Sequence, residues 1–114
     1  MGHDNRAPTA VELESMSALV SRAMDDGAFG LDTGLEYIPA PYAQRAGLVA
    51  LTRAAKRPGS LYVTHLRDEG AMLELAVAKA IDIGRTTAQP VHISHIESTG
   101  AVNRGKSTTI LRAR

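Results

Sequence analysis

The chain's hydrophobic and polar positions follow two periods that alternate along its length. Apolar residues at helical spacing predict three helices, over about residues 9–27, 44–56 and 71–87. Short apolar runs bounded by glycine, proline or polar residues predict three buried strands, at residues 28–32, 61–65 and 90–95. A further short helix is expected from Ser107 onwards. The predicted order is helix, strand, helix, strand, helix, strand and tail.

Local signals support several of these boundaries. Thr9 and Glu12 have the spacing of a capping box, which predicts the start of the first helix. Pro39 and Pro41 exclude a regular helix from residues 35–42, so a loop is expected there. The helix at 71–87 has the clearest apolar face, made of Met72, Leu73, Ala76, Val77, Ala80, Ile81 and Ile83.

The predicted strands recur about every thirty residues, which is the period of a β/α repeat with parallel strands. Eight such units and roughly 250 residues are needed to close a TIM barrel, and this chain has 114 residues and three units. Strands this apolar are expected to be covered on both faces. The sequence therefore predicts an α/β fold: residues 1–114 form a single partial domain of about three β/α units, part of a (β/α)8 barrel.

Composition narrows the classes of function. With 13 basic and 12 acidic residues the net charge is +1, and no basic cluster is interleaved with aromatic residues, so no nucleic-acid partner is expected. The chain contains no cysteine, which excludes disulfides and thiolate metal sites within it. No apolar run approaches the roughly 20 residues of a membrane span, and a cytoplasmic protein without a membrane partner is the default expectation.

Two histidines stand at the ends of successive predicted strands. His65 ends Leu-Tyr-Val-Thr-His, and His95 ends Val-His-Ile-Ser-His. A single histidine near a strand end is more often a hydrogen-bonded structural residue than a metal ligand. Because the carboxyl ends of neighbouring parallel strands lie at one edge of a sheet, both imidazoles are expected to converge there and to share one cation. Two imidazoles are only part of a metal site, since a catalytic metal needs further ligands.

The residues around this pair have competing interpretations. His92 lies three residues before His95, so alternation along a strand predicts that it points to the opposite face and is structural. Asp68 and Glu69 follow His65 in a strand-to-helix loop; they are either active-site groups or carboxylates that favour a helix start. Arg67 is expected either to bind a substrate carboxylate or to pair with a neighbouring acid.

Four separate motifs follow one another along the chain. They are Met-Gly-His-Asp-Asn-Arg-Ala at residues 1–7, Gly-Leu-Asp-Thr-Gly-Leu-Glu-Tyr at 30–37, Tyr-Val-Thr-His-Leu-Arg-Asp-Glu-Gly at 62–70 and Val-His-Ile-Ser-His at 91–95. Together, and in this order, they resemble the D-aminoacylases, the N-acyl-D-amino-acid deacylases of the amidohydrolase superfamily. The resemblance runs at least to Lys106.

The resemblance implies a zinc-dependent hydrolase on a TIM barrel that removes the acyl group from N-acyl-D-amino acids. It implies that His65 and His95 bind metal at the ends of the fifth and sixth barrel strands, and that Tyr37 lies against the substrate side chain. The family's other metal ligands and its catalytic aspartate fall on strands outside this chain. Where the family carries a lysine that helps to hold the substrate carboxylate, this chain has Glu97, which reverses the local charge.

The functional expectation is therefore a fragment of a zinc-dependent N-acyl-D-amino-acid deacylase that is inactive alone. Two alternatives stay open at this point. One is another enzyme of the same superfamily, such as a hydantoinase or dihydroorotase, although the motif at residues 30–37 argues against it. The other is a non-catalytic β/α unit. In either case three strands leave open edges and an uncovered sheet face, so self-association of the chain is expected.

Overall fold

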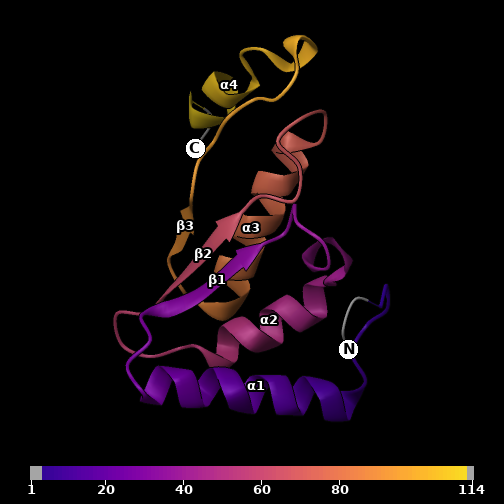
Figure 1. Ribbon diagram of the computed structural model, residues 1–114. Helices are drawn as coiled ribbons and strands as arrows, with labels where there is room; N and C mark the ends of the chain where they lie inside the picture. The colour runs from indigo at the N-terminus through magenta and orange to yellow at the C-terminus, as the bar shows by residue number, and fades with distance from the viewer. Residues whose placement is uncertain (1–3, 113–114) are drawn as a thin grey trace.

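The computed structural model describes residues 4–112, so the first three residues of the motif at 1–7 lie outside the described part. Helices and strands alternate along the chain (Figure 1). They are α1 (Ala10–Asp25), β1 (Gly30–Gly34), η1 (Ala40–Tyr42), α2 (Arg45–Ala54), β2 (Leu61–His65), α3 (Leu73–Thr87), β3 (Val91–Ile93), η2 (Ala101–Asn103) and α4 (Lys106–Arg112).

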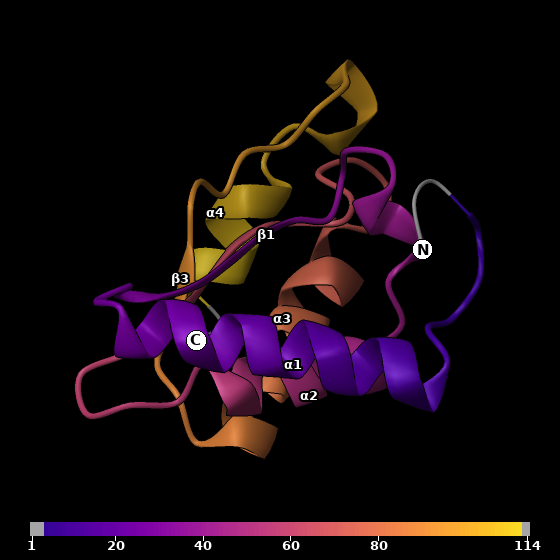
Figure 2. The same cartoon turned by 60° about the horizontal axis from the view of Figure 1, so that its bottom comes forward.

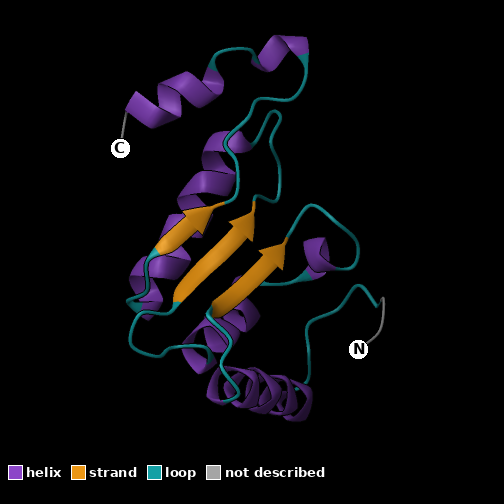
Figure 3. Ribbon diagram, turned by 60° about the vertical axis from the view of Figure 1, so that its left-hand side comes forward, coloured by secondary structure: helices purple, strands orange, loops and turns teal. Residues whose placement is uncertain are grey.

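The three strands form one parallel sheet in the order β1-β2-β3 (Figure 3). Gly30 lies opposite Leu61 at the start of the first pair, and Gly34 lies opposite His65 at its end. The strands point the same way, so their carboxyl ends share one edge of the sheet. This arrangement is the predicted α/β repeat of three parallel strands alternating with helices.

Helices α2 and α3 cover one face of this sheet, and α1 packs against α2 (Figures 2 and 3). Along β2, Tyr62 and Thr64 are fully buried on the helix side, whereas the residues between them are only half-buried. Tyr62 packs in one apolar cluster with Leu35, Leu48, Val49 and Ile83. A second cluster, between α3 and α4, contains Leu66, Leu73, Ala76, Val77, Ala80 and Ile110.

The other face of the sheet carries the side chains that alternate with Tyr62 and Thr64. His65 is among them, and no helix within residues 4–112 lies over this face (Figure 3). The outer edges of β1 and β3 are also unpaired in the described part of the chain. The radius of gyration is 14.7 Å, against roughly 13 Å for a compact domain of this length. The molecule is thus a layered slab with one open face.

The first helix has the predicted start but buries less than its pattern suggests. Thr9 Oγ1 accepts from the Glu12 backbone, and the Glu12 side chain accepts from the Thr9 backbone, which confirms the capping box. Of the residues of α1, only Met24 is buried, and Leu19 is exposed. Within residues 4–112 no helix is both long and apolar enough to cross a membrane.

The first strand begins two residues later than predicted. The apolar run suggested residues 28–32, but the strand is Gly30–Gly34, and Phe29 before it is exposed. A Cβ at Gly30 would lie 2.1 Å from the Leu61 carbonyl oxygen, so the two backbones meet closely where glycine allows it. The start of β1 at Gly30 therefore follows from its pairing with β2 and not from the start of the apolar run.

The last strand is shorter than predicted, which corrects the argument about His92. Strand β3 ends at Ile93, so His95 lies beyond it, and strict alternation no longer relates the two histidines. His92 pairs with Val63, which is on the same face of the sheet as His65. The prediction that His92 points to the opposite face was therefore wrong, and its side chain is exposed.

Candidate metal centre

The two predicted histidines meet at the carboxyl edge of the sheet. His65 is the last residue of β2, and its Nδ1 lies 3.0 Å from Nε2 of His95. The ring centroids are 4.9 Å apart and the planes make an angle of 61°. The carbonyl oxygen of His65 accepts from the Leu35 backbone N–H and from the Thr64 hydroxyl, which fixes the backbone at this point. The expected convergence of the two imidazoles is present.

This geometry fits a shared zinc ion. Two nitrogens bound to one tetrahedral zinc at about 2.0–2.1 Å would lie roughly 3.3 Å apart, close to the 3.0 Å between His65 Nδ1 and His95 Nε2. Both are neutral-imidazole donors of the kind that zinc prefers. Within residues 4–112, this pair supplies two of the four ligands of a closed tetrahedral site.

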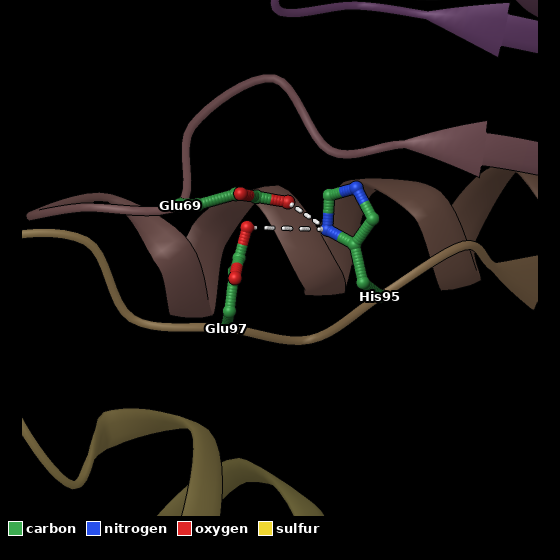
Figure 4. A group of neighbouring side chains, drawn as sticks. All are labelled: Glu69, His95 and Glu97. Carbon is green, nitrogen blue, oxygen red and sulfur yellow. Dashed lines mark ion pairs between the residues drawn. The ribbon is translucent and has the colours of Figure 1, made fainter.

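A buried carboxylate lies against the other side of the His95 ring. Glu69 Oε1 is 2.7 Å from His95 Nδ1, and the Glu69 side chain is only 3% exposed (Figure 4). Burial raises the pKa of Glu69; the nearby carboxylates of Glu97 and Glu36 raise it further, while His95 lowers it. His95 therefore has different neighbours at its two nitrogens, imidazole at Nε2 and carboxylate at Nδ1.

The loop after β2 holds Glu69 in this position. Asp68 Oδ1 accepts from the backbone N–H groups of Gly70 (2.8 Å) and Met72 (3.0 Å), so Asp68 organises the turn before α3. The backbone carbonyl of Glu69 accepts from Thr99 N–H at 2.8 Å. The two adjacent acids that the sequence could not separate thus differ: Asp68 shapes the loop, and Glu69 faces the histidine.

Glu97 is a second carboxylate near His95 Nδ1. Its Oε1 lies 3.8 Å from His95 Nδ1, and its side chain is 64% exposed (Figure 4). Ligand atoms of Glu69, His95 and Glu97 lie within 4.8 Å of one another, which makes these three residues a possible metal-binding group. They use Nδ1 of His95, whereas the pair with His65 uses Nε2, so the structure presents two candidate positions for a cation around one ring.

Tyr37 and Arg67, predicted to bind substrate, are placed differently from each other. The centroids of the Tyr37 and His65 rings are 6.1 Å apart, a Cβ added at Gly34 would lie 3.2 Å from Tyr37 Cδ2, and the Tyr37 side chain is largely exposed. The Arg67 guanidinium donates to the backbone carbonyls of Pro41 and, at 2.8 Å, Ala43. Arg67 therefore fastens the loop before α2 and pairs with none of the acids suggested for it; a substrate role for it stays a prediction.

A cavity of about 350 Å³ lies on the helix side of the sheet. Its lining comes from α2, α3 and the ends of β1 and β2, and includes Leu48, Thr64, Arg67 and Ile83. Thr64 and His65 point to opposite faces of β2, so this cavity is separate from the histidine pair. The candidate metal centre lies on the open face of the sheet, because the imidazoles of His65 and His95 meet there.

Sequence reasoning identified both histidines but did not single out Glu69. Its position four residues after His65, in the loop that follows the strand, was the available signal. The competing interpretation as a helix-start carboxylate was equally consistent with the sequence. Only the three-dimensional course of residues 94–99 shows which of the neighbouring acids meets His95.

The sequence of this chain is similar to those of known N-acyl-D-amino-acid deacylases. No family model matches the chain. It is 38% identical over 106 residues to D-aminoacylase and 36% identical over 104 residues to N-acyl-D-glutamate deacylase, both of Alcaligenes xylosoxydans xylosoxydans. These matches cover 93% and 91% of this chain but only 22% and 21% of those proteins, so the chain spans about a fifth of their length.

Solved structures of the same group of enzymes match the fold of this chain. A crystal structure of D-aminoacylase matches 99% of this chain with a TM-score of 0.93 and 36% identity, over 24% of its own length. N-acyl-D-glutamate deacylase from Bordetella bronchiseptica, solved with zinc and a phosphonate mimic of the tetrahedral intermediate, matches with a TM-score of 0.91 and 35% identity. Another D-aminoacylase structure describes a binuclear metal centre.

The three parallel strands, the helices between them and the sequence itself thus correspond to one part of a metal-dependent amidohydrolase barrel. This chain is homologous, over nearly all of its length, to a segment of the D-aminoacylases and N-acyl-D-amino-acid deacylases.

Proposed function

We propose that this chain is a central barrel segment of a zinc-dependent N-acyl-D-amino-acid deacylase, and that it is inactive alone. The observation that carries the proposal is the approach of His65 Nδ1 to His95 Nε2, 3.0 Å apart, at the carboxyl edge of a sheet homologous to those enzymes. Active sites of β/α barrels lie at this edge. The open face and the two unpaired strand edges are where the remaining strands of a barrel would pack.

Within such an enzyme the residues of this chain have limited roles. His65 and His95 would hold zinc through the two nitrogens that face each other. Bound zinc supplies polarisation of the amide carbonyl and a bound water of lowered pKa. Tyr37, beside His65 and largely exposed, would contact the substrate side chain. No group in the chain is assigned to proton transfer, for which the aspartate expected elsewhere in the barrel is needed.

A chimera tests this proposal. Residues 4–112 replace the matching segment of the D-aminoacylase of Alcaligenes xylosoxydans xylosoxydans, to which the chain is 38% identical. We expect the zinc-loaded chimera to hydrolyse N-acyl-D-amino acids and to leave the L-enantiomers intact. His95→Ala should abolish activity, and Glu14→Ala, at an exposed position of α1, should retain it. A folded, zinc-containing chimera without deacylase activity would contradict the proposal.

A further inference from the structure

His95 lies at the middle of the candidate centre, because each of its two ring nitrogens has a polar side-chain atom close to it. Nε2 lies 3.0 Å from His65 Nδ1, and Nδ1 lies 2.7 Å from Glu69 Oε1. Figure 4 shows one nitrogen turned toward the carboxylates and the other turned away from them. An imidazole with one nitrogen on a carboxylate presents the lone pair of its other nitrogen to a metal.

The environment of Glu69 shows that this contact is built into the fold. Its side chain is 3% exposed, and within residues 4–112 neither Glu69 Oε1 nor His95 Nδ1 has a hydrogen-bond partner, although the two buried atoms lie only 2.7 Å apart. A buried carboxylate oxygen without a hydrogen-bond partner is unfavourable, because it has lost its water. The 2.7 Å between the two atoms is typical of a charge-assisted contact, so a proton on His95 Nδ1 would supply the donor that this oxygen lacks.

The backbone on both sides of the contact is fixed. Asp68 receives two backbone N–H groups of the turn, and Thr99 N–H donates to the carbonyl of Glu69 at 2.8 Å. Asn103 Nδ2 donates in turn to the carbonyl of Thr99 at 2.8 Å. The segment after His95 and the loop after His65 are therefore tied together, which fixes the backbone positions from which the Glu69 and His95 side chains meet.

We propose that Glu69 is a positioning residue for His95: it holds the ring as the Nδ1–H tautomer and thereby aims the Nε2 lone pair at the point shared with His65. With His95 in this tautomer, the 3.0 Å contact in the metal-free chain is a hydrogen bond from His65 Nδ1–H to that lone pair. The part of this inference that concerns zinc rests on the proposed function, whereas the tautomer does not. Glu97, at 3.8 Å from His95 Nδ1 and 64% exposed, is the more distant and more solvated of the two carboxylates, so the role is assigned to Glu69.

The tautomer is measured directly by long-range ¹H–¹⁵N correlation spectroscopy of the histidine rings in the metal-free chain at pH 8. We expect His95 to carry its proton on Nδ1. Glu69→Gln keeps an oxygen acceptor of the same shape and should keep the tautomer, while Glu69→Leu should lose it. Glu97→Gln is the matched control, since it removes the other carboxylate near the same nitrogen, and it should change nothing.

Zinc affinity, measured by competition with a chromophoric chelator, is the second readout. Loss of a group that orients a metal-binding histidine typically weakens affinity about 10–100-fold, and we expect this for Glu69→Leu, with partial rescue in Glu69→Gln. An Nε2–H tautomer of His95 in the unmodified chain would overturn the inference without recourse to any variant. Equal weakening by Glu97→Gln would also overturn it, in favour of a cation held by Glu69, His95 and Glu97. Failure of the unmodified chain to bind zinc, with the tautomer as expected, would count against the proposed function alone.

Discussion

Substituting Gly30 by alanine tests the pairing of β1 with β2, in which Gly30 lies opposite Leu61 and Gly34 lies opposite His65. A Cβ at this position would lie 2.1 Å from the Leu61 carbonyl oxygen and 3.1 Å from its carbonyl carbon, both of them backbone atoms that no rotamer change can move. Contacts under 3.0 Å essentially never occur for a real Cβ, so β1 and β2 must separate by about an ångström. Overpacking of this kind destabilises by about 1–3 kcal/mol.

Urea denaturation followed by far-ultraviolet circular dichroism measures this loss. With a slope of about 1–3 kcal/mol per molar urea, Gly30→Ala should lower the midpoint by roughly 1 M. Gly47→Ala is the control, because Gly47 lies in α2 and a Cβ added there would have nothing within 4 Å, and it should stabilise by up to about 1 kcal/mol. An unchanged midpoint for Gly30→Ala would refute the close approach of the two strands.

Three further outcomes are expected. The hydrogen bond from Arg6 lowers the pKa of Glu12, so the carboxylate contributes fully to stability above its ordinary pKa of 4.5, and that contribution shrinks below 4.5 and is lost only as pH falls through the lowered pKa of the folded state. The melting temperature of Glu12→Gln should lie below that of the unmodified chain at pH 7, and the difference should narrow from pH 4.5 to pH 3 without closing. In the chimera described above, Glu97→Lys should raise kcat/KM for anionic N-acyl-D-amino acids by about tenfold or more, since charged hydrogen bonds are worth about 1.5–3 kcal/mol; an unchanged or lower value would show that Glu97 does not face the substrate carboxylate. Because both outer strand edges and one sheet face are open within residues 4–112, sedimentation of the isolated chain should show species larger than the 12.1 kDa monomer. Sedimentation as a monomer alone would contradict this.

The sequence predicted the repeat well, because long periodic segments and capping residues act locally. The third helix and the strand ending at His65 lie where the pattern placed them, and the capping box at Thr9 is formed. Boundaries that depend on contacts between distant residues were less predictable. The start of β1 at Gly30 depends on the approach of Leu61, which no local pattern encodes.

The same distinction applies to the candidate site. Parallel topology alone was sufficient to predict that His65 and His95 meet, since it requires only that their strands end at one edge. The expected orientation of His92 was wrong because β3 stops at Ile93 and the alternation rule does not reach His95. Glu69 was not distinguished from Asp68, because the choice between them depends on a loop that Thr99 fastens from thirty residues further along the chain.

Zinc titration calorimetry on the chain and three histidine variants tests the central claim most directly. A closed structural zinc site contributes about 10–16 kcal/mol; with two of four ligands present, roughly half of that corresponds to a dissociation constant of about 1–200 μM. We predict binding in this range for the unmodified chain and for His92→Ala, and loss of binding in both His65→Ala and His95→Ala. Binding that persists in His65→Ala, or that His92→Ala alone abolishes, would contradict a metal centre shared by His65 and His95.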